Sequence, residues 1–262
     1  MSRAAAVGLL LAAALTGTTY AQTTTPAVRD PNGLAVLQQA VNALGGTAAI
    51  GQIQDCTATG SMQASPGGGL TSGSFRWENS GREFRYENPS PSGLRIFASG
   101  HGKPALEDNG VVRAVGRQGA VGNFPPHLLP LMLLRALVNQ NVSVQLLGPG
   151  VVGGRSAIRV KIALGASASR AGTSSGQQWF FDATSGLPLR VEYLLVAEGA
   201  PGVSVVAATE FGSYRAVSGI QIPFQIVTYV DGVQTSVVTL NSVVFNTGIS
   251  SGDFDLSTGG AQ

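Results

Sequence analysis

The sequence predicts a mainly β fold: an antiparallel sheet or barrel of about ten to twelve strands, accompanied by two helices. Apolar and polar residues alternate with a period of two over most of the chain after residue 55, as they do in half-buried strands. Turn residues separate these alternating segments at short intervals, which is typical of all-β sheets. Helical spacing of apolar residues is confined to residues 31–44 and 126–138.

The composition indicates one domain and excludes several classes of function. Of the 262 residues, 44% are hydrophobic and 11% are charged, and the formal net charge is +2. This small excess of positive charge does not provide the basic surface that a nucleic-acid-binding protein uses. The single cysteine, Cys56, excludes a disulfide scaffold, and we expect its thiol to be buried. We expect a single domain over residues 31–262.

Residues 1–21 have the pattern of a signal peptide. Arg3 precedes an apolar run, and a small-residue cleavage site ends at Ala21. We therefore expect cleavage after Ala21 and a periplasmic or secreted protein, with residues 22–30 as a flexible leader. An N-terminal anchor that is never removed is the alternative, although the apolar run is short for a membrane span.

The first helix is predicted to follow this leader. Asp30 is a good N-cap and Pro31 suits the first helical position. Four apolar residues then recur at spacings of three and four, on one helical face: Leu34, Leu37, Val41 and Leu44. Gly45-Gly46 ends the helix, because glycine readily adopts the left-handed C-cap conformation. Residues 47–54 are consistent with a further short helical turn.

Residues 75–87 predict a hairpin, here called the aromatic hairpin, with its turn at Asn79-Ser80-Gly81. Its aromatic side chains alternate with charged residues and so share one face: Phe75, Trp77, Phe84 and Tyr86. This face has two interpretations, ordinary core packing or one wall of an apolar ligand cavity. A curved sheet of this size has a large apolar face, and small barrels of this kind hold single apolar ligands.

The remaining strands follow the same alternation. One begins at Cys56, one follows residue 141, and the others are expected at residues 94–98, 111–115, 158–164, 177–182, 189–196, 203–214, 220–230 and 233–245. Asp231-Gly232 is a strong hairpin turn. The Gly-, Ala- and Ser-rich residues 165–176 are predicted to form a hairpin loop rather than a linker between domains.

Residues 126–138 interrupt the strand pattern and predict a helix that begins near Pro126, with Pro130 in its first turns. Leucine and methionine lie on almost every face, so the helix should be buried on more than one side. It is either a core helix or a lid over an apolar cavity. The residues that would face such a cavity are Leu131, Leu134 and Leu137.

Signals for catalysis and for metal or cofactor binding are weak. His101 lies in a glycine-rich turn, where an ordinary loop histidine is the simpler interpretation. The glycines fit no phosphate-binding or dinucleotide-binding pattern. Asp253 and Asp255 lack the spacing of a calcium loop. No Gly-x-Ser-x-Gly nucleophile motif is present. We therefore expect no enzymatic activity, no cofactor and no metal.

Several segments resemble the outer-membrane lipoprotein-sorting (LolA-like) superfamily of exported bacterial proteins. The resemblance lies in the helix ending at Ala43-Leu44-Gly45-Gly46, and in the segments 179–190 (WFFDATSGLPLR), 211–215 (FGSYR), 220–224 (IQIPF) and 244–249 (VFNTGI). It implies an unclosed half-barrel, a curved antiparallel sheet whose concave face is covered by the N-terminal helix and the internal apolar helix. It also implies that acyl chains or lipids bind between sheet and helices, and that no cofactor is needed.

From these observations we expect a monomeric, exported, non-enzymatic binder or carrier of lipid, acyl chains or a lipoprotein. Apolar burial would supply the affinity, at about 0.8 kcal/mol per buried methylene. The expected cavity residues are those of the aromatic hairpin and of the apolar helix: Phe75, Trp77, Phe84, Tyr86, Leu131, Leu134 and Leu137. The alternatives are an integral outer-membrane β-barrel, a protein-binding envelope sensor with an envelope protein as partner, and an exported hydrolase using serine or His101.

Overall fold

The computed structural model describes residues 27–65, 70–115, 128–164, 176–196 and 204–256. The predicted signal peptide, the glycine-rich loop at 165–175 and the first two residues of the predicted apolar helix lie outside these ranges. Three α-helices are described: α1 (Pro31–Ala43), α2 (Gly46–Gly51) and α4 (Leu129–Val138). A short 3-10 helix, η4 (Ser251–Phe254), follows the last strand.

Thirteen strands form one antiparallel sheet, one more than the upper end of the expected range. The first six are β1 (Asp55–Ala64), β2 (Thr71–Ser80), β3 (Glu83–Ser90), β4 (Gly93–Gly100), β5 (Lys103–Asp108) and β6 (Val111–Ala114). The other seven are β7 (Val142–Val152), β8 (Arg155–Leu164), β9 (Gln177–Asp182), β10 (Pro188–Val196), β11 (Ser204–Val217), β12 (Ile220–Val230) and β13 (Val233–Phe245).

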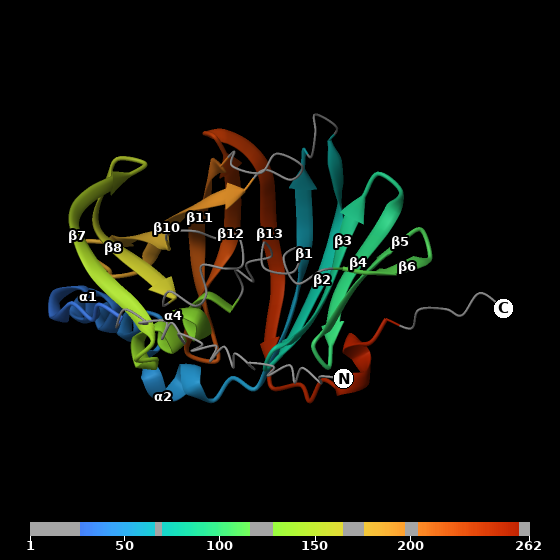
Figure 1. Cartoon of the computed structure of the whole chain (residues 1–262), viewed down its shortest axis with the longest axis horizontal. Coiled ribbons are helices and arrows are strands. Elements are labelled where there is room, and N and C mark those ends of the chain that lie inside the picture. The colour runs from blue at the N-terminus through green and yellow to red at the C-terminus, as the bar shows by residue number, and fades with distance from the viewer. Residues whose placement is uncertain (1–26, 66–69, 116–127, 165–175, 197–203, 257–262) are drawn as a thin grey trace, which may run out of the picture.

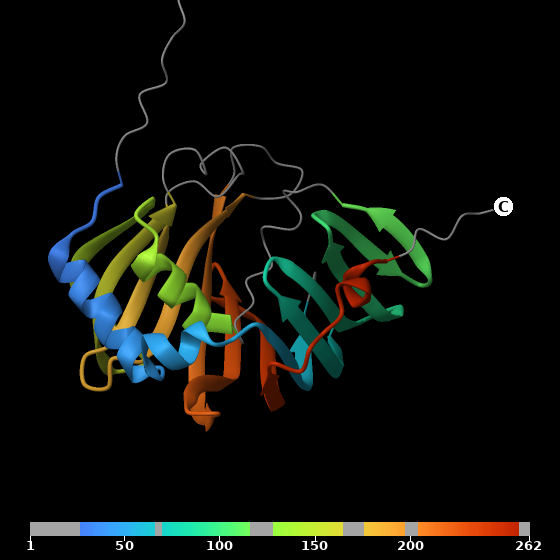
Figure 2. The same cartoon turned by 90° about the horizontal axis from the view of Figure 1, so that it is seen from below.

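The strands are ordered β6-β5-β4-β3-β2-β1-β13-β12-β11-β10-β9-β8-β7. Each half of the sheet is thus a meander of consecutive strands, and the halves meet where β1 pairs with β13 in the middle. The sheet curves into an open half-barrel with β6 and β7 at its two edges (Figures 1 and 2). This confirms the half-barrel that the family resemblance implied.

The three helices lie over the concave face of one half of the sheet only (Figure 2). Helix α1 packs against β7 and β8, and α4 packs against α1, α2, β7 and β12. Leu37, Val41 and Leu44 are fully buried, and Leu34 is partly buried against the same core, as the helical spacing predicted. Figure 2 shows the described helices on the β7–β12 side rather than over β2–β6.

Asp30 fixes the beginning of α1 and also ties it to the sheet. One carboxylate oxygen accepts a hydrogen bond from the Asn32 backbone N–H at 3.0 Å, and the other accepts from the Leu146 N–H of β7 at 2.8 Å. These bonds, first of all the one from Leu146, lower the pKa of Asp30. The N-cap prediction is confirmed, and residues 27–30, at the end of the expected leader, lie alongside β7.

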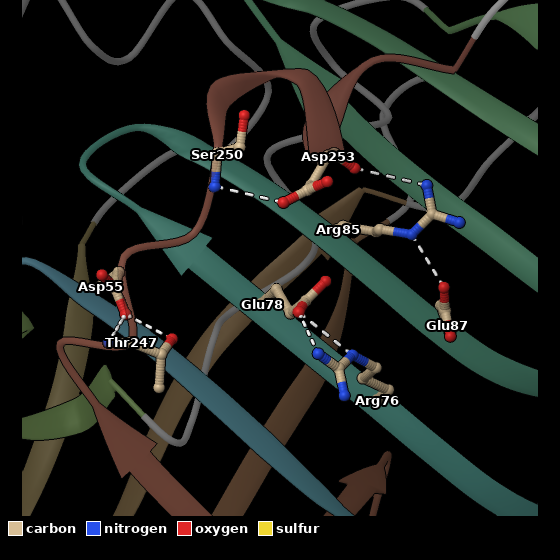
Figure 3. Close-up of polar contacts among 8 residues, drawn as sticks. All are labelled: Asp55, Arg76, Glu78, Arg85, Glu87, Thr247, Ser250 and Asp253. Carbon is tan, nitrogen blue, oxygen red and sulfur yellow. Dashed lines mark hydrogen bonds and ion pairs between the residues drawn. The ribbon is translucent and has the colours of Figure 1, made fainter.

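A buried carboxylate joins the two halves of the sheet at the end of the β1–β13 pair. Asp55 accepts hydrogen bonds from the backbone N–H of Thr247 (2.7 Å), the Thr247 hydroxyl (3.0 Å) and the backbone N–H of Gly248 (2.9 Å) (Figure 3). Burial opposes ionisation of Asp55, but these hydrogen bonds outweigh it and lower its pKa. The segment that follows β13 is thereby fixed against the first residue of β1.

The residues that follow Thr247 and Gly248 cross the convex face of β3 and β4. Helix η4 packs against both strands and buries Phe254 completely. A Cβ added at Gly100 would collide with Asp255 and with the Phe254 backbone, so glycine permits this close approach. The side chain of Asp253 accepts from the Ser250 N–H, and its carbonyl accepts from Arg85 (Figure 3). Helix η4 therefore covers part of the convex face in this half of the sheet.

Candidate ligand-binding cavity

An apolar surface runs along the concave face from the helix-covered half to the aromatic hairpin. Strand register places Val160, Trp179 and Val191 on this face of β8, β9 and β10. Across the middle of the sheet it continues through Leu240 and Ala58 to the aromatic hairpin. These side chains are buried in one hydrophobic cluster, except that of Phe84 in the hairpin, which is partly buried against it.

The aromatic side chains of the hairpin share the concave face, as the alternation predicted. Trp77 lies opposite Tyr86, and Phe84 lies opposite Asn79. The ring centroids of Phe84 and Tyr86 are 4.9 Å apart, and those of Trp77 and Tyr86 are 6.1 Å apart. Phe75 completes the row, with its ring centroid 4.3 Å from that of Trp77. These separations lie in or close to the range of attractive aromatic pairs.

The turn of the hairpin differs from the prediction. We expected it at Asn79-Ser80-Gly81, but β2 continues to Ser80, and the turn is made by Gly81 and Arg82. Gly81 has a φ of 59°, which glycine adopts without a steric penalty. The longer strand places the Asn79 side chain on the concave face, where its Nδ2 donates to the Tyr86 hydroxyl at 2.9 Å.

Helix α4 has a packed side and a cavity side. Leu129, Leu133 and Leu134 are buried in the core, whereas Leu131 and Leu137 are only partly buried.

The backbone carbonyls at the C-terminal end of α4 have no hydrogen-bond partners within the helix. The Arg29 guanidinium donates hydrogen bonds to several of them: those of Ala136 and Leu137, and also those of Asn139 and Val142 beyond the helix.

A cavity of about 240 Å³ lies between α4 and the aromatic hairpin. Its lining residues come from the end of β2, the turn, the start of β3 and one side of α4 with the preceding residue: Asn79, Gly81, Arg82, Phe84, Tyr86, Leu128, Leu131, Met132 and Arg135. One wall is therefore aromatic and belongs to the sheet, and the opposite wall is aliphatic and belongs to the helix. The two charged residues of this lining are Arg82, from the turn of the hairpin, and Arg135, from α4.

The structure brings together some of the predicted site residues and not others. Phe84, Tyr86 and Leu131 line the cavity. Phe75 and Trp77 lie beside it, in the same aromatic row. Of the other two helix positions, Leu134 is buried in the core and Leu137 is partly buried against it.

Sequence reasoning missed the polar residues of the cavity. Asn79 was assigned to a turn, and Arg82 and Arg135 have the sequence context of ordinary solvated residues in a turn and on a helix. The one available signal was the position of Arg135, the sole charge in the apolar helix. A lone charge on such a helix marks the side that reaches solvent or a polar opening.

Charged side chains of the hairpin lie on the convex face, away from the cavity. Arg76 pairs with Glu78 at 2.5 Å, and Arg85 pairs with Glu87 at 2.8 Å (Figure 3). On the concave face, burial raises the pKa of the Tyr86 hydroxyl well above its ordinary value, so the phenol stays neutral. The aromatic wall of the cavity therefore carries no negative charge of its own.

The other candidates from the sequence do not form a site with this cavity. His101 has a φ of 51°, and its Nδ1 lies 3.4 Å from an Asp255 carboxylate oxygen at the exposed end of β4. Cys56 is buried, and burial raises the pKa of its thiol to about 12. Among the described residues, no group of three or more His, Cys, Asp and Glu side chains is placed to hold a metal ion.

Within the described ranges, no helix combines the length and the apolar character that crossing a bilayer requires.

No protein-family model matches the chain, and no curated protein matches it by sequence. Solved structures share its fold. A domain from Vibrio parahaemolyticus named for outer membrane lipoprotein sorting is 14% identical with a TM-score of 0.57, over 86% of this chain and 96% of that one. A DUF1329 family protein from Desulfovibrio piger is 15% identical with a TM-score of 0.56, over 84% and 96%. A LolA superfamily protein from Nitrosomonas europaea is 11% identical with a TM-score of 0.54, over 86% and 97%.

Proposed function

We propose, from the LolA-like fold that this chain shares with those structures, that it is an exported, non-enzymatic binder of lipid or acyl chains. The observation that carries the proposal is the cavity between α4 and the aromatic hairpin, with an aromatic wall on one side and an aliphatic wall on the other. The signal-peptide pattern of residues 1–21 supports export.

Binding in such a cavity depends on removing apolar surface from water. Each buried methylene contributes about 0.8 kcal/mol, so part of one chain already gives useful affinity. The contribution is non-directional and does not depend on the identity of the chain. A protein that uses it holds the acyl chain without specific hydrogen bonds to that chain, which suits a carrier.

The volume limits what the cavity holds. At about 240 Å³ it is smaller than the roughly 300–1,000 Å³ of typical ligand pockets. In this state it accommodates part of a single chain. Further room would come from movement of α4 away from the hairpin, because α4 is the wall that belongs to a separate element.

The proposal is tested by purifying the protein from producing cells without detergent and analysing organic extracts by mass spectrometry. We expect acyl compounds in near-stoichiometric amounts. The variant Leu131→Asp should lose them, because it places a charge against an apolar ligand. The matched control is Val138→Asp on the same helix, where the side chain is 58% exposed and the ligand should be retained.

Circular dichroism must first show that both variants keep the sheet. The proposal is overturned if the wild-type extract holds no apolar compound and the folded protein binds no fatty-acid probe at micromolar concentration. It is also overturned if Leu131→Asp and Val138→Asp retain equal amounts of ligand.

A further inference from the structure

The cavity has a polar character that its apolar walls do not explain. Of its polar lining residues, Asn79 and Tyr86 are hydrogen-bonded to each other. The other two are Arg82 and Arg135, on opposite walls. No aspartate or glutamate is among the described residues that line the cavity. The two charged residues of the described lining are therefore both basic.

These two arginines differ from most others in the chain. Arg76, Arg85, Arg95, Arg155 and Arg190 are ion-paired with carboxylates. Arg29 and Arg159 donate to backbone carbonyls, and Arg215 lies over the Phe224 ring. Within the described part of the chain, Arg82 and Arg135 have no ion pair and no hydrogen-bond acceptor for their guanidinium groups. Both are exposed, so their donors are accessible to a ligand.

We infer that the cavity takes a single-chain anionic amphiphile, with its carboxylate or phosphate group held between Arg82 and Arg135. The inference rests on the proposed function and adds the chemistry of the head group to it. The apolar chain of the ligand would lie against Phe84 and Tyr86 on one wall and Leu131 on the other. Guanidinium groups suit this role because their forked donors match carboxylate and phosphate oxygens.

The arrangement divides recognition between the two ends of the ligand. The walls select an apolar chain, and the cavity volume of about 240 Å³ favours part of one chain over several. The two guanidinium groups select negative charge at the opening. A neutral amphiphile of the same chain length would leave both charges without a partner, and a cationic one would be repelled.

The test compares four probes that share one chain: dodecanoate, dodecyl phosphate, dodecanol and dodecyltrimethylammonium. Each is titrated into the full mature protein by calorimetry, below its critical micelle concentration and at low ionic strength. We expect the two anions to bind about tenfold more tightly than dodecanol, the factor that one charge-assisted hydrogen bond of about 1.4 kcal/mol supplies. Added salt should reduce this preference.

The variants Arg82→Gln and Arg135→Gln should each reduce the preference for the anions, and the double variant should abolish it. Dodecanol binding should stay within about twofold of wild type, because the apolar walls are unchanged. The control is Arg113→Gln, which removes an exposed guanidinium from the edge strand β6 and should leave both the affinity and the preference unaltered.

The outcomes separate the inference from the function on which it rests. Binding of no probe overturns the proposed function. Equal binding of all four probes, or a preference that survives in the double variant, supports an apolar binder but overturns the inference about the head group. With the preference confirmed, tighter binding of dodecanoate indicates a fatty acid, and tighter binding of dodecyl phosphate indicates a phosphorylated lipid.

Discussion

Replacing Asp55 with asparagine should weaken the junction between the two halves of the sheet. The residue is 6% exposed, and its carboxylate accepts three hydrogen bonds from Thr247 and Gly248. Asparagine has nearly the same shape, but only one of its two terminal atoms accepts hydrogen bonds. The substitution therefore isolates the chemistry of the carboxylate from its packing.

The expected loss follows from the geometry. Oδ1 of asparagine can still accept from Thr247, whereas its Nδ2 would face the backbone N–H of Gly248, where Asp55 presents Oδ2 at 2.9 Å. The variant thus loses a charge-assisted bond and leaves a donor unsatisfied. Together these changes should lower the free energy of unfolding by about 2–4 kcal/mol at pH 7.

The pH dependence distinguishes this mechanism from a packing defect. The pKa of Asp55 is lower in the folded protein than its ordinary value. Its contribution to stability is therefore complete above the unfolded-state pKa of about 3.9 and is lost as the pH falls through the lower, folded-state pKa. The difference between wild type and Asp55→Asn should shrink progressively below about pH 4.

Urea unfolding followed by circular dichroism at neutral and acid pH measures both quantities. The control is Glu107→Gln, since the Glu107 carboxylate has no hydrogen bond or ion pair with other described residues. It should change stability by less than about 0.5 kcal/mol. The reasoning is refuted if Asp55→Asn unfolds like the control at pH 7, or if its deficit is the same at both pH values.

Three further predictions concern other parts of the chain. Phe254→Ala should lower the free energy of unfolding by about 3–5 kcal/mol, because this residue, the last of η4, is 1% exposed where η4 packs against β3 and β4; a loss below about 1 kcal/mol in denaturant titration would contradict this packing. The Cys56 thiol, whose pKa burial raises to about 12, should react with a thiol reagent at pH 8 far more slowly in the folded protein than after unfolding, and equal rates would show that it is accessible. The mature protein should begin at Gln22, and an intact mass that includes Met1 would show that the predicted signal segment is retained.

The local elements were predictable where one pattern dominates the sequence. Asp30 and Pro31 mark the beginning of α1, and the structure confirms the cap. Strand β5 was missed, because Pro104 and the charged residues around it hide the period of two. Its pairing with β4, from Arg95 opposite Asp108 to Gly100 opposite Lys103, defines it as a strand. Here tertiary context overrides weak propensity.

The placement of the helices and of the cavity's charges could not be predicted in the same way. Helix α4 packs against β12 and β7, and only the pairing of β1 with β13, a contact between distant segments, brings the aromatic hairpin beside this half of the sheet. Arg82 and Arg135 line the same cavity for this reason. Alternation shows which face of the hairpin is apolar, but it does not show what lies opposite that face.

The strand order also bears on how the chain folds. Twelve ladders join the described strands, and eleven of them connect neighbours along the chain, whereas Cys56 pairs with Phe245 in the twelfth. Hairpins form in about 1–10 μs, but closing a loop this long costs more entropy as its length grows. The central ladder should therefore form last and set the refolding rate, with the edges of β1 and β13 unpaired until then. Destabilising substitutions at Ala58 should accordingly slow refolding, and so should those at Val160, because its local meander is already formed when the central ladder closes; both should change the unfolding rate much less.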